Sequence, residues 1–187
     1  MQAAWQKVFP GGEVGPVKPE STQTGEIHVI RGRPRHASDI AMLINRLNPD
    51  KPPTSPEDIM AAFGEKAFLL LQYNSQLMGM VGWQVENLVA RATDLYIDPS
   101  LPIGQTLTTL ITEVEKASRD LQCEVSLLFL PPNLARHEAV WKNLGYEQRM
   151  PDKLGVQAWQ EAAIESMTKG SSLFFKQLRV DRILRPI

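Results

Sequence analysis

The sequence predicts a mixed α/β domain, with a mostly antiparallel central sheet of about six to seven strands flanked by four to five helices. Three strand-like segments follow one another between residues 67 and 97 with only short polar turns between them, which is typical of an antiparallel meander. A strand, helix, strand pattern over residues 88–130 then implies one parallel pair with a right-handed crossover. Amphipathic segments before and after these strands supply the remaining helices.

Composition and length agree with one globular domain. The chain has 187 residues, of which 43% are hydrophobic and 22% charged, and its formal net charge is −1. Its longest apolar runs are too short to span a bilayer, and its N-terminus lacks the basic and apolar regions of a signal peptide, so we expect no membrane association and a cytoplasmic location. The single cysteine, Cys123, excludes an internal disulfide, and no Cys/His spacing suggests a metal site.

Three regions are predicted along the chain. Residues 1–25 contain Gly-Gly, three prolines and the run STQTG, which favours a flexible N-terminal arm. Residues 26–178 form the domain, and residues 179–187 form a basic C-terminal tail.

The first half of the domain begins with the alternating strand EIHVIRGRP from Glu26, followed by a helix over 37–47. SPEDIMAAFG predicts a second helix, with Ser55 as N-cap, Asp58 completing a capping box and Gly64 as terminator. The meander follows. Its three strands are predicted at 67–73, 77–85 and 88–97.

The second half alternates helices and strands. A helix beginning near Gln105 is followed by the buried strand VSLLFL and then by a helix with Asn133 as cap and Gly145 as stop. The inward stripe predicted for the first of these helices is Leu107, Leu110, Ile111, Val114 and Leu121. A short strand in YEQRM, a helix over 155–167 and a closing strand over 171–178 complete the domain.

This order of elements, together with LMGMVGW (77–83), ATDLYIDP (92–99) and AVWKNLGY (139–146), resembles the GNAT (Gcn5-related N-acetyltransferase) family. The resemblance covers about Ile27 to Leu178. It implies acetyl-CoA as donor, lying in a wedge between the strands 88–97 and 125–130, with its pyrophosphate at the following turn. The residues it implies for this site are Leu95, Tyr96, Ile97, Ile103, Gly104, Gln105, Thr106, Asn133 and Trp141.

Two positions depart from the family pattern. In the turn PSLPIGQ, Pro102 stands where the family has Arg or Gln, and only Gly104 remains of its small residues, so the phosphate-binding loop is degenerate. No Lys or Arg lies between Arg91 and Lys116. Trp141 stands where the family often has a Tyr that protonates the leaving thiolate, and an indole cannot act as that acid.

Candidates for acid–base chemistry lie on the third strand of the meander and beside it. Asp94 and Glu86 are candidate general bases, and strand alternation predicts that Ala90, Ala92, Asp94, Tyr96 and Asp98 share one face. Tyr96 would then lie beside the carboxylate of Asp94. The alternative is that Asp94 and Asp98 are ordinary exposed or turn-capping acids.

Two functional hypotheses follow. The first is an acyl-CoA-dependent N-acetyltransferase for an unknown primary amine, a small molecule or a protein, with acceptor loops in NPDKPPT (48–54) and MPDKLG (150–155). The second is a catalytically inactive protein of the same fold that serves as a protein-binding or regulatory module. A protein partner or a homodimer fits either hypothesis, whereas the near-neutral charge argues against nucleic acid.

Overall fold

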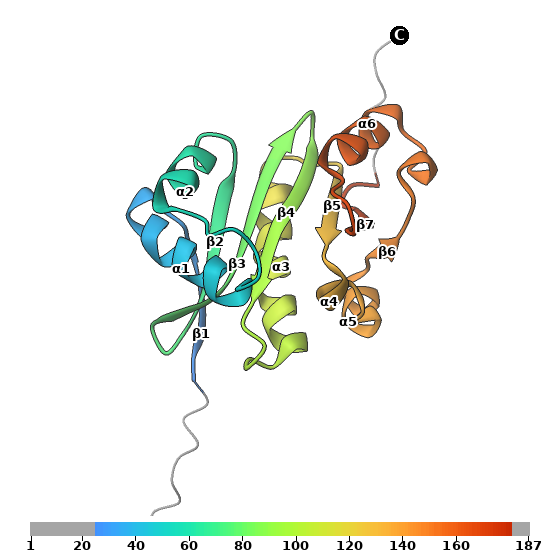
Figure 1. The fold of residues 1–187 in the computed structure, drawn as a ribbon. Coiled ribbons are helices and arrows are strands. Elements are labelled where there is room, and N and C mark those ends of the chain that lie inside the picture. Colours follow the sequence, from blue (N-terminus) through green and yellow to red (C-terminus); the bar gives the residue numbers. More distant parts are fainter. Residues whose placement is uncertain (1–24, 181–187) are drawn as a thin grey trace, which may run out of the picture.

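The computed structural model describes residues 25–180, which form one seven-stranded sheet with helices on both faces (Figure 1). The sheet order is β1-β2-β3-β4-β5-β7-β6, and all neighbouring strands are antiparallel except β4 and β5. The fold class predicted from the sequence is confirmed. The predicted arm, apart from residue 25, and the tail beyond residue 180 lie outside the described residues.

The elements have the following bounds. The strands are β1 (Ile27–Arg31), β2 (Ala67–Tyr73), β3 (Gln76–Glu86), β4 (Val89–Ile97), β5 (Val125–Leu130), β6 (Glu147–Gln148) and β7 (Ser172–Gln177). The helices are α1 (Ala37–Leu47), α2 (Pro56–Ala62), α3 (Ile103–Asp120), α4 (Pro132–Ala135), α5 (Glu138–Leu144) and α6 (Gln157–Ser166). Two 3₁₀ turns, η1 (Pro34–His36) and η2 (Pro151–Lys153), precede α1 and α6.

Local sequence signals set several element ends. At α2, the Ser55 hydroxyl accepts from the N–H of Asp58, and the Asp58 carboxylate accepts from the N–H of Ser55 at 2.8 Å, so the predicted capping box is confirmed. Gly145 ends α5 with φ of 87°, a left-handed conformation that glycine adopts without steric cost.

Three predicted details of the second half are wrong. The helix predicted over 133–145 is two helices, α4 and α5, and Asn133 lies inside α4, whose N-cap is Pro131. Helix α3 begins at Ile103 rather than near Gln105. Leu121 is 54% exposed because α3 ends at Asp120 and Leu121 only caps it, outside the helical periodicity on which the predicted stripe rests.

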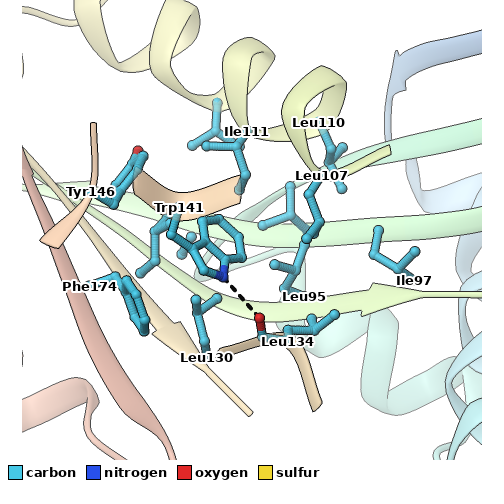
Figure 2. Packing of buried hydrophobic residues seen from close by; sticks show 14 of the residues in the cluster. Leu95, Ile97, Leu107, Leu110, Ile111, Leu130, Leu134, Trp141, Tyr146 and Phe174 are labelled. Atoms are coloured by element: carbon cyan, nitrogen blue, oxygen red, sulfur yellow. Dashed lines mark hydrogen bonds between the residues drawn. The ribbon is translucent and has the colours of Figure 1, made fainter. Parts of the chain in front are cut away.

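The main hydrophobic core lies between the sheet and the helices α3 and α5 (Figure 2). Trp141 of α5 is fully buried at its centre, against α3 and Phe174 of β7. On the other face of the sheet, α1 and α2 cover β2 and β3, and α6 covers β5 and β7. The sheet therefore has two covered faces: the α3 face, covered by α3 and α5, and the α1/α6 face, covered by α1, α2 and α6.

A β-bulge in β4 changes which side chains point to each face. Gly82 of β3 pairs with Asp94 and Trp83 pairs with Ala92, so Thr93 is the extra residue. As a result Ala92 lies in the core of the α3 face with Leu95, whereas Asp94 faces the other way. The prediction that Ala92 and Asp94 share one face is therefore wrong, because simple alternation does not hold through a bulge. A Cβ at Gly82 would lie 2.7 Å from an oxygen of the Asp94 carboxylate, so a larger residue there would displace this side chain from its present position.

Candidate active site

The central feature is the point where β4 and β5 separate. Their parallel pairing covers only four residue pairs, from Val89↔Val125 to Ala92↔Leu128. Beyond it β4 continues to Ile97 without a partner on that side. The bulge at Thr93 increases the local twist of β4, and the prolines that follow β5 have no N–H with which to continue a ladder.

A cleft of about 860 Å³ opens at this separation. Its walls come from the free end of β4, the segment after β5, the end of α1 with the turn that follows, and the turn between α6 and β7. The lining residues are Arg46, Leu47, Asn48, Lys51, Thr93, Asp94, Leu95, Tyr96, Ile97, Pro99, Phe129, Pro131, Pro132, Asn133, Thr168, Lys169, Gly170 and Ser171.

The backbone of β4 presents unpaired hydrogen-bonding groups to this cleft. Asp98 donates its N–H to the Met78 carbonyl at 2.8 Å. This bond determines which residues of β4 direct their backbone groups toward β3. In an antiparallel pair these bonds recur at every second residue, so Tyr96 also bonds toward β3, while Leu95 and Ile97 direct their N–H and C=O groups toward β5. Because β5 no longer pairs there, these backbone groups can bind an extended ligand.

An acid–base cluster lies on the α1/α6 side of the same strand segment. The Lys66 ammonium donates to the Asp94 carboxylate at 2.6 Å, and the Thr93 hydroxyl donates to it at 3.1 Å. Tyr96 follows two residues along the strand and packs against the core beneath α1. Burial, and then the negative charge of Asp94, raise the pKa of the Tyr96 phenol, so this hydroxyl stays protonated and can donate a proton or a hydrogen bond.

Asp98 fixes the loop between β4 and α3 to the end of α1. Its carboxylate accepts from the Arg46 guanidinium and from the hydroxyl and N–H of Ser100, the latter at 2.9 Å. Burial opposes ionisation of Asp98, but the hydrogen bonds from Ser100 and the Arg46 charge outweigh it and lower its pKa. Asp98 is therefore a paired structural carboxylate, and Arg46 is held at the rim of the cleft.

The architecture has clear counterparts among solved structures. A GNAT-family acetyltransferase of Staphylococcus aureus Mu50 superposes with a TM-score of 0.64 at 13% identity, over 82% of this chain and 100% of that one. The ribosomal-protein-S18-alanine N-acetyltransferase of Escherichia coli gives 0.64 at 11% identity, over 87% and 100%. The PaiA N-acetyltransferase of Thermoplasma acidophilum, in complex with coenzyme A, gives 0.59 at 12% identity, over 81% and 99%.

The chain has the GNAT fold. The fold expected from the resemblance of the three sequence motifs is therefore confirmed. No family model and no curated protein sequence matches the chain.

The structure brings together only some of the residues that the GNAT resemblance implied. Leu95, Tyr96, Ile97 and Asn133 line the cleft, together with the candidate base Asp94. Five others do not line it: Ile103, Gly104, Gln105, Thr106 and Trp141. The first four lie in the first turn of α3, where Thr106 is buried and donates its hydroxyl to the Pro102 carbonyl.

Trp141 and Glu86 lie away from the cleft. The Trp141 indole is fully buried and donates its N–H to the Leu134 carbonyl at 2.9 Å (Figure 2). Glu86 lies at the opposite end of the β3–β4 hairpin and accepts from Arg91 at 2.7 Å, beside a separate cavity of about 230 Å³ under α6. Neither residue can meet a group bound between β4 and β5 in this arrangement.

The cleft also contains three basic residues that sequence reasoning did not assign to the donor site: Arg46, Lys51 and Lys169. They come from segments far from the β4–α3 turn, so no local spacing signals them. The predicted acceptor loop NPDKPPT contributes Asn48 and Lys51, whereas none of the residues of MPDKLG lines the cleft.

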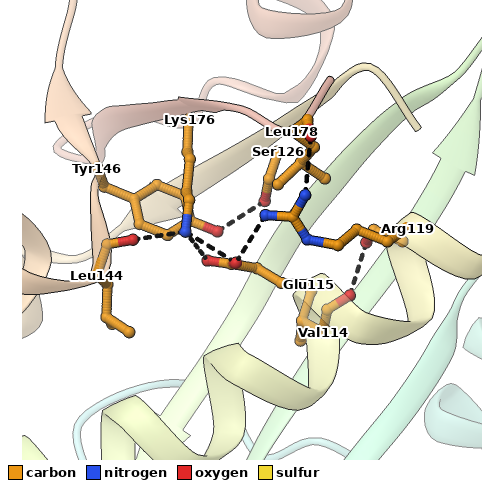
Figure 3. A network of polar contacts seen from close by, with 9 residues as sticks. Val114, Glu115, Arg119, Ser126, Leu144, Tyr146, Lys176 and Leu178 are labelled. Atoms are coloured by element: carbon orange, nitrogen blue, oxygen red, sulfur yellow. Dashed lines mark hydrogen bonds and ion pairs between the residues drawn. The ribbon is translucent and has the colours of Figure 1, made fainter. Parts of the chain in front are cut away.

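A second polar cluster lies on the α3 face and is closed (Figure 3). The Lys176 ammonium donates to both oxygens of Glu115 at 2.9 Å and to the Leu144 carbonyl at 2.7 Å. The Tyr146 hydroxyl donates to the Ser126 hydroxyl at 2.9 Å. Burial raises the pKa of Tyr146 far above the usual range. This network joins α3, β5, β7 and the end of α5.

Over residues 25–180, no helix combines the length and apolar character needed to cross a membrane. The same part of the chain has no group of three His, Cys, Asp or Glu side chains arranged to hold a metal ion.

Proposed function

We propose that the protein is an acyl-CoA-dependent N-acetyltransferase that binds acetyl-CoA between β4 and β5 and acts on a primary amine. The observation that carries this proposal is the open edge of β4, where the N–H and C=O groups of Leu95 and Ile97 face a cleft of about 860 Å³. A pantetheine arm carries two amides and can add to such an edge as an extra strand does.

The donor site supports this ligand at two places. Backbone groups of β4 supply donors and acceptors for the pantetheine amides, and the first turn of α3 supplies N–H groups that have no partner within the helix. The helix dipole adds about 0.3–1 kcal/mol for an anion there. Gly104 leaves that turn open, since a Cβ at this position would have only Val140 nearby, at 3.7 Å. The PaiA N-acetyltransferase of Thermoplasma acidophilum, which has a similar fold, is in complex with coenzyme A in its structure.

The cleft side chains support general acid–base chemistry. Bound acetyl-CoA supplies an activated acyl group with a thiolate as leaving group. The Asp94 carboxylate, held by Lys66 and Thr93, can accept a proton from the incoming ammonium directly or through water. The protonated Tyr96 hydroxyl can donate to the departing sulfur, the role for which Trp141 is unsuited. The Leu95 N–H, which lies nearest the bulge, can stabilise negative charge that develops on the acyl oxygen, while the Leu95 C=O and the Ile97 backbone groups remain for the pantetheine amides.

A second candidate function is binding without catalysis. It is favoured by the first turn of α3, which begins at Pro102 without a side-chain cap, and by the buried Trp141, whose indole N–H is already engaged. In that case the cleft and the exposed loops would serve a regulatory protein contact. Acetyl-CoA binding separates the two functions.

The test is calorimetric titration of the full chain with acetyl-CoA at low salt, using Gly104→Glu and Gly104→Gln as a matched pair. Both side chains have the same size and have space above α3, but only Glu brings a negative charge to the expected pyrophosphate position. We expect wild type and Gly104→Gln to bind and Gly104→Glu to lose affinity. Equal affinity of both variants would contradict this placement, and absence of binding to wild type would favour the second candidate.

A further inference from the structure

The acceptor side of the cleft carries unbalanced positive charge, and this observation deepens the proposed function. Among the ionisable residues that line the cleft, Arg46 is neutralised by Asp98 and Asp94 is neutralised by Lys66. Lys51 and Lys169 remain, and neither has an ion-pair partner among residues 25–180. The described part of the cleft therefore has a surplus of two positive charges.

The two lysines stand on different walls. Lys51 follows α1, which packs over β3 and β4. Lys169 lies in the turn before β7, whose Ser172 pairs with Leu130 at the end of β5. A ligand between the separated strands would thus have one ammonium group on the β4 side and one on the β5 side.

Local hydrogen bonds shape both turns. The Asn45 amide donates to the Thr54 carbonyl at 2.9 Å and its oxygen accepts from the Thr54 N–H at 2.7 Å, which ties together the ends of the loop that carries Lys51. In the other turn, the Ser171 hydroxyl donates to the Thr168 carbonyl at 2.8 Å and accepts from its N–H at 3.2 Å. Both lysines are therefore presented by turns with defined backbone conformations.

These lysines lie on the opposite face from the expected phosphate site of acetyl-CoA. The loop of Lys51 follows α1 on the α1/α6 face, and Lys169 follows α6 on that same face. Helix α3, whose first turn is the proposed pyrophosphate site, packs on the other face. The surplus positive charge is thus available to the acceptor rather than to the donor.

We infer that the acceptor is a small primary amine that carries a carboxylate or phosphate group, bound by Lys51 and Lys169 while its amine reaches Asp94. The inference rests on the proposed acetyltransferase function. Two ammonium groups in a partly enclosed cleft attract the anionic group of such an acceptor. They repel an amine that has no anionic group, which gives selectivity among acceptors.

The experiment measures acetylation and binding of four amines by wild type and by the variant Lys51→Glu/Lys169→Glu. The probes are L-aspartate, its diamide, which lacks both carboxylates, phosphoethanolamine, and ethanolamine, which lacks the phosphate, each added to protein saturated with acetyl-CoA. A control variant, Lys116→Glu/Lys153→Glu, makes the same change in net charge at exposed positions outside the cleft. Comparison of aspartate with phosphoethanolamine distinguishes a carboxylate from a phosphate.

We expect wild type and the control to prefer a probe with an anionic group over the analogue that lacks it by about tenfold or more at low salt, and the cleft variant to lose or reverse this preference. Equal use by wild type of the probes with and without an anionic group would overturn the inference, as would failure to bind either anionic probe. Loss of acetyl-CoA affinity in the cleft variant would also overturn it, since the lysines would then serve the donor. Failure of the proposed function is recognised separately, by wild type that does not bind acetyl-CoA.

Discussion

Two clusters in this molecule contain the same three chemical groups, a carboxylate, a lysine and a tyrosine, but differ in their surroundings. Glu115, Lys176 and Tyr146 are closed in beneath α3, and each has hydrogen-bond partners within the protein (Figure 3). Asp94 and Tyr96, with Lys66 beside them, border the cleft, and the Tyr96 hydroxyl has no hydrogen-bond partner in the described chain. Residue type alone therefore does not identify a site, whereas partners and access do.

The closed cluster should matter for stability alone. We expect Glu115→Ala to lower the free energy of unfolding by about 3 kcal/mol, because it leaves the Lys176 ammonium without its carboxylate. Urea unfolding followed by tryptophan fluorescence measures the change, with Glu113→Ala on the exposed side of α3 as control. A change no larger than that of the control would contradict a structural role for this network.

The open cluster should matter for catalysis. We expect Tyr96→Phe to lower kcat by about 10²-fold while acetyl-CoA affinity and stability change little, because the change removes only a proton donor. The raised pKa of Tyr96 keeps the donor protonated beyond the ordinary tyrosine value of 10.0, so the alkaline loss of wild-type activity should lie above that pH. Thiol release as a function of pH measures both effects. An unchanged kcat in Tyr96→Phe would remove Tyr96 from the mechanism.

The smallest effect should come from Asp98. This carboxylate is paired within the protein, as Glu115 is, but it lies at the edge of the cleft, as Asp94 does. We expect Asp98→Asn to cost about 1–2 kcal/mol of unfolding free energy at neutral pH. Because the folded pKa of Asp98 is lowered, this contribution is present above the unfolded value of about 3.8 and is lost as the pH falls through the folded pKa. Denaturation at a series of pH values, with Asp120→Asn as control, should show the deficit shrinking in acid. A deficit independent of pH would contradict the ionic role.

Much of the fold could be predicted from the sequence because local signals mark its elements. The bounds of α1, β2 and β5 agree with the predicted segments, and the capping box at Ser55 and the stop at Gly145 lie where their residue types require. The split between α4 and α5 was not predictable in this way, because the helical pattern of NLARHEAVWKNLG continues through it.

The site was less predictable because it depends on pairing between distant segments. The bulge at Thr93 arises from the register of β3 against β4 and reverses the facing expected from strict alternation. Lys51 and Lys169 are far apart in the sequence and line one cleft only because the sheet brings their segments together. The pairing of Arg46 with Asp98 likewise joins residues 52 positions apart. Sequence motifs identified the strand that forms the cleft, and Asp94 on it, but not the roles of the basic residues around it.

The central claim is that acetyl-CoA binds along the free edge of β4. Amide hydrogen exchange of the full chain, measured by NMR with and without acetyl-CoA, tests it at single residues. We predict that acetyl-CoA slows exchange of the Leu95 and Ile97 amides, which face the cleft, and leaves the Tyr96 amide, already bonded toward β3, almost unchanged. Saturation with acetyl-CoA that leaves exchange at Leu95 and Ile97 unaltered would contradict the claim.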